Sequence, residues 1–117
     1  MMADTSLKIE EQQLDQILVM TVAGRIDSSN AGEFMGRLTG LLKGGASAIL
    51  VDLARVLYLT SAGFRALIVA VDTADQRSAK LALCSISPDV QELFEMGGML
   101  DLFQIFGTRE EGLSSMH

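Results

Sequence analysis

The tetrapeptide Thr60-Ser61-Ala62-Gly63 contains a hydroxyl that could carry function. Ser61 is expected at the start of a helix that continues with Phe64, so its hydroxyl could cap free backbone N–H groups, an interaction worth about 1 kcal/mol. The same hydroxyl could instead accept a phosphate, whose charge of roughly −1.5 to −2 would suit the helix dipole and would face any docked partner. Both interpretations of Ser61, a helix cap and a phosphorylation switch, follow from the same position.

Two acidic residues, Asp27 and Asp52, follow or end predicted strands, where carboxylates can hold Mg²⁺ for acyl-phosphate chemistry. Phospho-accepting receiver domains also need an acidic pair after the first strand and a lysine late in the chain. The lysines of this chain are Lys8, Lys43 and Lys80, which leaves that constellation incomplete. Asp27 is better interpreted as a residue that fixes a loop or a cap through bonds to the backbone.

Residues suited to catalysis are scarce. His117 is the only histidine and stands at the chain end, and Cys84 lies in an apolar strand pattern, where cysteine usually acts as a small buried hydrophobe. The glycine pairs at 44–45 and 97–98 lack the spacing and the lysine of a phosphate-binding loop. The sequence therefore predicts no enzyme, no metal site and no cofactor.

Length and composition favour one globular domain over residues 1–117. The chain has 117 residues, 49% of them hydrophobic, and can bury roughly two-thirds of its unfolded surface. Nine Lys and Arg against fifteen Asp and Glu give a net charge of −6, which opposes binding to nucleic acid.

A lone cysteine is typical of a reducing compartment, and the first residues lack an apolar signal segment. The longest uncharged apolar run near the middle, Ala66–Val71, is far shorter than the roughly 20 residues that cross a bilayer. We therefore expect a cytoplasmic protein with no membrane insertion.

Apolar periodicity predicts alternating strands and helices. Strands are predicted at residues 7–11, 17–22, 48–53, 80–85 and 102–106, with a turn at 12–16 and loops at 25–29 and 54–59. Helical spacing of apolar residues is predicted at 31–42 and 64–74. Capping patterns predict three helix starts, at Asn30 with Glu33, Ser87 before Pro88, and Thr108 with Glu111. The fold class is α/β, with a mixed, mostly parallel sheet of about four to five strands flanked by about four helices.

Three segments in this order resemble the STAS-domain family of anti-sigma factor antagonists. The most specific runs from Val51 to Phe64 and contains the Ser61 tetrapeptide. The second is the run 24–27 (GRID), which leads into the first predicted helix, and the third is the run 85–99 (SISPDVQELFEMGGM). The resemblance covers about residues 7–111 and implies a STAS fold in a regulatory protein without catalysis of its own.

The resemblance implies regulation by partner switching. The unmodified domain would bind an anti-sigma factor that is also a serine kinase, phosphorylation of Ser61 would release it, and a PP2C-type phosphatase would restore binding. A dianion trapped at an interface without a cation costs several kcal/mol, enough to abolish micromolar binding. The implied docking surface consists of Asp27, Ser28, Thr60, Ala62, Gly63 and Arg65.

The sequence departs from the family pattern at two positions beside the acceptor. Thr60 replaces the usual aspartate, and Ala62 replaces the usual serine or threonine. Thr60 thereby becomes a conceivable second acceptor. The main alternative function is a constitutive STAS scaffold, docked to a transport ATPase or a signalling assembly and never phosphorylated, and a small-ligand role ranks third.

Overall fold

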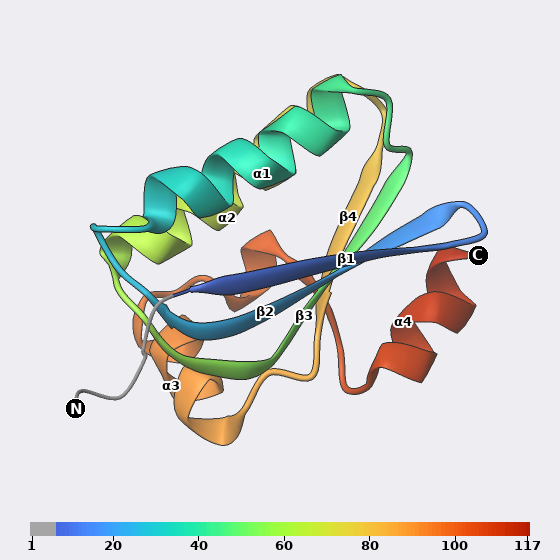
Figure 1. Cartoon of the computed structure of the whole chain (residues 1–117). Helices are drawn as coiled ribbons and strands as arrows, with labels where there is room; N and C mark the ends of the chain where they lie inside the picture. The colour runs from blue at the N-terminus through green and yellow to red at the C-terminus, as the bar shows by residue number, and fades with distance from the viewer. Residues whose placement is uncertain (1–6) are drawn as a thin grey trace.

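The computed structural model describes residues 7–117 and contains one five-stranded sheet (Figure 1). Its strands lie in chain order, with β1 antiparallel to β2 and the remaining neighbours parallel. The strand bounds are β1 (Lys8–Leu14), β2 (Ile17–Ile26), β3 (Ala48–Leu59), β4 (Lys80–Cys84) and β5 (Gln104–Phe106). The predicted mixed, mostly parallel sheet is confirmed.

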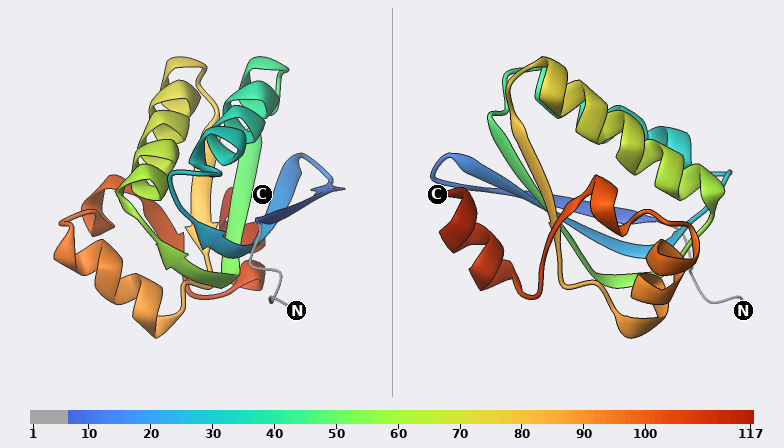
Figure 2. Two further views of the ribbon diagram at one scale, coloured as in Figure 1. Left: turned by 60° about the vertical axis from the view of Figure 1, so that its left-hand side comes forward. Right: turned by 180° about the vertical axis from the view of Figure 1, so that it is seen from behind.

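Four α-helices flank this sheet on its two faces. Helices α1 and α2 lie side by side over one face, whereas α4 packs against the opposite face (Figure 2). The helix bounds are α1 (Ala31–Lys43), α2 (Ser61–Gln76), α3 (Pro88–Met96) and α4 (Arg109–Met116), with a short 3₁₀ helix η1 (Leu100–Leu102) before β5. Among residues 7–117, no helix combines the length and the apolar composition needed to cross a membrane.

Strand β2 shows how the sequence builds a core on each face of the sheet. Successive side chains of a strand point to opposite faces. Met20 and Val22 therefore join the large core under α1, α2 and α3, while Ile17 and Val19 join the smaller core under α4. All four side chains are buried, which explains why the sequence of this strand is an almost continuous run of apolar residues.

The second half of β3 corrects the prediction of a loop at 54–59. The buried residues there are Leu53, Val56 and Leu59, one in every three, instead of one in every two. Two irregularities in the pairing with β2 insert extra residues into β3 and produce this spacing. Because the extra residues remove the period-two pattern of a strand, the segment resembles a loop in sequence although it continues the sheet.

The N-terminal hairpin is also tighter than the sequence predicted. Strand β1 extends to Leu14, so the turn consists of Asp15 and Gln16, with Asp15 in the left-handed region at φ 56°. Strand β2 continues past Gly24 to Ile26, which shortens the predicted loop that follows it. Hydrogen bonding to a neighbouring strand therefore extends both strands beyond their apolar runs.

Two of the three predicted caps are confirmed. The Ser87 hydroxyl accepts a bond from the Val90 amide at 3.3 Å, and the Thr108 hydroxyl accepts one from the Glu111 amide at 3.1 Å. The Glu111 carboxylate accepts a bond from the Gly107 amide at 3.2 Å, one residue before the expected position. No side chain caps the start of α1, so the predicted box of Asn30 and Glu33 is wrong.

Candidate functional site

Ser61 is the first residue of α2 and follows β3 after one intervening residue, Thr60. Thr60 is the N-cap by backbone conformation, but neither hydroxyl caps the helix, so the predicted cap role of Ser61 is wrong. The backbone N–H and the hydroxyl of Thr60 both donate to the carbonyl oxygen of Ile26, at 3.0 and 3.2 Å. These bonds tie the start of α2 to the end of β2, while Ser61 remains exposed.

Gly63 allows the first turn of α2 to pack tightly against the sheet. A Cβ atom at this position would lie 2.6 Å from Cδ2 of Leu59, 3.0 Å from Cγ2 of Ile26 and 3.2 Å from the Ile26 carbonyl oxygen. No larger residue fits without moving those groups. Gly63 is buried, so its role in the site is to place the neighbouring exposed residues.

The loop before α1 is held by Asp27 and Asn30. The Asp27 carboxylate accepts bonds from the backbone N–H of Ser29, at 2.9 Å, and from the Ser29 hydroxyl. The Asn30 side chain accepts a bond from the Asp27 amide at 2.9 Å and donates to the Arg25 carbonyl at 2.8 Å. The prediction that Asp27 fixes a loop is confirmed, and Asn30 is engaged in the loop instead of capping the helix.

The bond from the Ser29 hydroxyl is the main reason why the pKa of Asp27 lies below its ordinary value of 3.8. The loop therefore stabilises the carboxylate form, and this stabilisation is present above the ordinary pKa and lost as the pH falls through the lowered one. We expect Ser29→Ala to raise the Asp27 titration midpoint, measured by carboxyl ¹³C NMR. Ser28→Ala, a neighbouring exposed hydroxyl, should leave it unchanged, and an equal shift in both variants would contradict this assignment.

Two hollows meet at Ser61. One, of about 380 Å³, lies between α1 and α2 and is lined by Ser28, Ser61, Ala62 and Arg65 among others. The other, of about 710 Å³, lies between α2 and the end of α3 and is lined by Thr60, Ser61 and Arg65 together with apolar side chains. The structure thus brings four predicted docking residues, Ser28, Thr60, Ala62 and Arg65, around the predicted acceptor Ser61. The other two are placed differently, because Asp27 is turned toward its own loop and Gly63 is buried.

The larger hollow contains residues that the sequence did not predict for the site. Tyr58 comes from the bulged part of β3, and the guanidinium of Arg25 lies over its ring, 4.9 Å from the centroid. Leu93 and Met99 come from the segment around the end of α3. Only a regular alternation of polar and apolar residues could have predicted from the sequence that Tyr58 is an exposed residue of a strand. The two bulges disrupt this alternation in β3.

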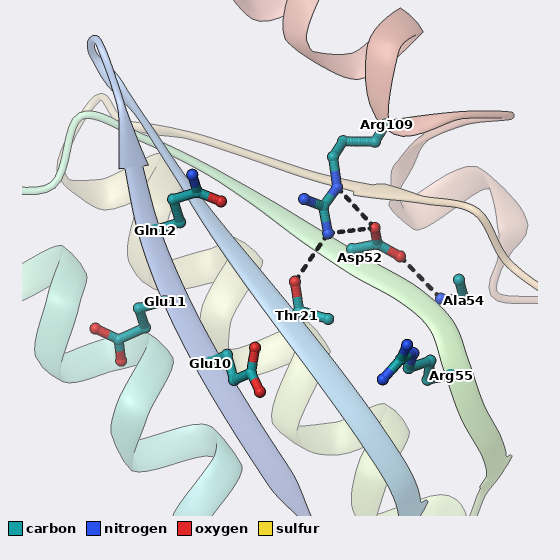
Figure 3. Close-up of a pocket in the computed structure, with 8 residues that line it drawn as sticks. All are labelled: Glu10, Glu11, Gln12, Thr21, Asp52, Ala54, Arg55 and Arg109. Carbon is teal, nitrogen blue, oxygen red and sulfur yellow. Dashed lines mark hydrogen bonds and ion pairs between the residues drawn. The ribbon is translucent and has the colours of Figure 1, made fainter.

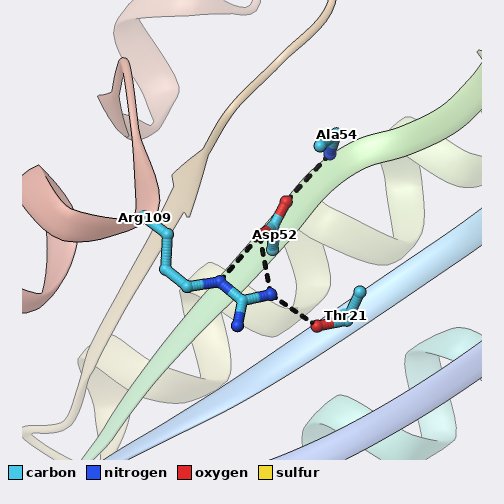
Figure 4. Close-up of polar contacts among 4 residues, drawn as sticks. All are labelled: Thr21, Asp52, Ala54 and Arg109. Atoms are coloured by element: carbon cyan, nitrogen blue, oxygen red, sulfur yellow. Dashed lines mark hydrogen bonds and ion pairs between the residues drawn. The ribbon is translucent and has the colours of Figure 1, made fainter.

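A polar pocket of about 500 Å³ lies on the other face of the sheet, beside α4 (Figure 3). At its base, the Asp52 carboxylate accepts bonds from Arg109 Nε and from the Ala54 amide, each at 2.9 Å. Arg109 Nη2 lies 2.9 Å from the same carboxylate and donates to the Thr21 hydroxyl at 2.9 Å (Figure 4). These bonds join the start of α4 to β2 and β3.

This pairing argues against the receiver-domain interpretation of the two acids. Asp52 faces Thr21 inside the sheet, whereas Asp27 lies beyond the end of β2, so the two carboxylates do not share a site. Within residues 7–117, no group of three His, Cys, Asp or Glu residues is placed to hold a metal ion. Cys84 is buried, and this burial raises the pKa of its thiol, which agrees with the interpretation as a small hydrophobe.

Comparison with solved structures gives the fold first. The chain superposes on the anti-sigma factor antagonist SpoIIAA in its unphosphorylated form with a TM-score of 0.78 at 16% identity, covering 92% of this chain and 95% of that one. The phosphorylated form of SpoIIAA, from Bacillus, gives a TM-score of 0.72, covering 96% and 100% of the two chains. At this identity the likeness shows a shared α/β fold.

Sequence comparison then gives the family. Residues 8–112 match the model of the STAS domain. The chain is 30% identical to BtrV of Bordetella bronchiseptica, which carries the name of an anti-sigma factor antagonist, over 89% of this chain and 90% of BtrV. It is 30% identical to the anti-sigma-B factor antagonist of Listeria monocytogenes, over 91% and 92% of the two chains. The chain belongs to the STAS-domain family of anti-sigma factor antagonists, whose members are regulators and not enzymes.

Proposed function

We propose that the chain is a partner-switching anti-sigma factor antagonist with Ser61 as its phosphoacceptor. Its unphosphorylated form binds an anti-sigma factor that is also a serine kinase, and phosphorylation of Ser61 releases that partner. The supporting observation is the position of Ser61, an exposed hydroxyl at the first residue of α2, where two hollows meet. A partner seated in these hollows would cover the hydroxyl directly.

The hydrogen bonds of the site favour Ser61 over Thr60 as acceptor. The Thr60 side chain is half-buried, and its hydroxyl donates to the Ile26 carbonyl, so a phosphate there would break the bond that ties α2 to β2. Ser61 could receive a phosphate without breaking a capping bond. Thr60 stands where the family usually has an aspartate, and this replacement leaves the Ser61 hydroxyl exposed.

The electrostatics of the helix start support a switch controlled by charge. A phosphate at the first residue of α2 is favourable within the free protein because the N-terminus of a helix attracts negative charge. The same charge covered by a partner, with no added cation, opposes association. The structure of SpoIIAA in a phosphorylated form indicates that a domain of this fold accommodates a phosphate.

The proposed partners are an anti-sigma factor with serine kinase activity and a PP2C-type phosphatase that reverses the modification, all in the cytoplasm. The proposed docking surface includes the exposed residues around the two hollows and the loop and glycine that position them. Its members are Asp27, Ser28, Thr60, Ala62, Gly63 and Arg65.

We expect phosphate on Ser61 in protein recovered from its native cells, in an amount that changes with growth condition. Intact mass and phosphosite mapping would measure it, with the Ser61→Ala protein as the control. Absence of phosphate under every condition, together with normal behaviour of Ser61→Ala cells, would contradict the switch. That outcome would favour the constitutive scaffold, because a scaffold needs the same fold and docking surface but no acceptor.

A further inference from the structure

The sheet face that carries α4 is covered over only part of its length. Pairing in the sheet aligns Lys8 with Ala23 and Ala23 with Arg55, and farther along it aligns Arg25 with Tyr58. These side chains therefore share the face beyond α4, and they are exposed or half-buried. We call this surface the open sheet face, and its residues are Lys8, Glu10, Ala23, Arg25, Ala54, Arg55 and Tyr58.

Positive charge gathers on the open sheet face of a chain whose net charge is −6. Lys8, Arg25 and Arg55 are all exposed, and none forms an ion pair with another residue in the described part of the chain. Glu10 is the one acid among the seven residues of this surface, while Glu11, which borders the same pocket, is paired with Arg37. Asp27 lies close enough to Arg25 for their charges to interact. Arg109 at its border is already paired with Asp52, so it adds little free charge (Figure 3).

Apolar groups accompany these cations. The Tyr58 side chain is 39% exposed, and that of the adjacent Leu57 is 64% exposed. The Arg25 guanidinium lies over the Tyr58 ring, 4.9 Å from its centroid, so the cation and the aromatic ring are held beside one another. A surface of fixed cations beside an exposed aromatic ring suits a ligand with carboxylates and apolar side chains.

We propose that the open sheet face is a docking surface for an acidic protein segment that carries apolar side chains. The inference requires no phosphate on Ser61, and of the residues of this surface it shares only Tyr58 with the hollows at Ser61. Nucleic acid is disfavoured because the chain as a whole repels phosphate. A second copy is disfavoured because a two-fold contact through this surface would place the same three cations against one another.

The test is an NMR titration of the full chain with a short synthetic peptide in which glutamate alternates with leucine. We expect amide shifts at Ala23, Arg25, Arg55 and Tyr58 that weaken as salt is added. Arg25→Glu/Arg55→Glu should weaken binding at least about tenfold. Lys43→Glu/Lys80→Glu changes the net charge equally on exposed residues outside this surface and should leave binding unchanged.

The milder pair Arg25→Gln/Arg55→Gln keeps the test decisive if charge reversal unfolds the protein, and it should also weaken binding. The proposal is overturned if the acidic peptide shifts other amides or none, or if a lysine–leucine peptide binds equally well. Tighter binding of a single-stranded oligonucleotide at these amides would also overturn it. The proposal would also be overturned if sedimentation showed that the chain self-associates and that Arg25→Glu/Arg55→Glu abolishes this self-association. Failure of Ser61 phosphorylation would leave all of these results unchanged.

Discussion

Ser61→Glu should weaken binding of the anti-sigma factor partner by at least about a hundredfold, while Ser61→Ala should bind nearly as well as the unmodified chain. The difference follows from charge, because an uncompensated carboxylate covered by a partner costs several kcal/mol and each 1.4 kcal/mol or so is a tenfold change in affinity. Titration calorimetry with the purified kinase that phosphorylates Ser61 would measure both affinities.

Ser114→Glu provides the matched control, because it places the same charge on an exposed position of α4. Its affinity for the partner should equal that of the unmodified chain. Equal binding by Ser61→Glu and Ser61→Ala would mean that a charge at the start of α2 does not control docking. The proposed switch would then be wrong, even if phosphate were found on Ser61.

Phe94→Ala should lower the free energy of unfolding by about 3–5 kcal/mol, a large part of the roughly 5–15 kcal/mol that stabilises a typical domain. The Phe94 side chain is fully buried. Its ring meets Phe64 edge-on at 4.8 Å and Phe103 at 5.6 Å between centroids, so removing it leaves a cavity and ends both aromatic contacts. Urea denaturation followed by circular dichroism would measure the change.

The control for this variant is Met96→Ala on the same helix, since Met96 is 80% exposed. We expect it to change the free energy of unfolding by no more than about 0.5 kcal/mol. Similar losses in the two variants would show that the buried Phe94 ring contributes no more to stability than an exposed side chain does, and would contradict this prediction. Phe94 also fixes α3, which supplies Leu93 to the hollow beside Ser61.

The sequence predicted the fold class because its strongest signals depend on short-range periodicity. Apolar runs such as Ile17–Val22 and the caps at Ser87 and Thr108 depend on neighbouring residues, and the structure contains each of them. The bulged end of β3 was missed because its pairing depends on β2, which contacts it across the sheet. Strand boundaries set by such a neighbour leave no clear pattern in the strand itself.

In the candidate site too, the sequence predicted the residues that depend on their own segment and missed those that come from distant segments. Ser61 at the start of a helix could be inferred from its own segment and from the family resemblance. Tyr58, Leu93 and Met99 could not, because they reach the hollow from the bulged strand and from the end of α3. The pairing of Asp52 with Arg109 joins residues 57 positions apart, beyond the range of any local pattern.

The two bulges of β3 also constrain which changes in chain length this protein can accept. They increase the twist of the strand and thereby determine where Thr60 and Ser61 lie at the start of α2. Removing one residue between Ala54 and Tyr58 would rotate the following side chains, so that positions now facing solvent would face the core. Insertions and deletions should therefore be tolerated in the turn of residues 44–47 but not in residues 54–58 of β3, although all of these except the buried Val56 are exposed or half-buried.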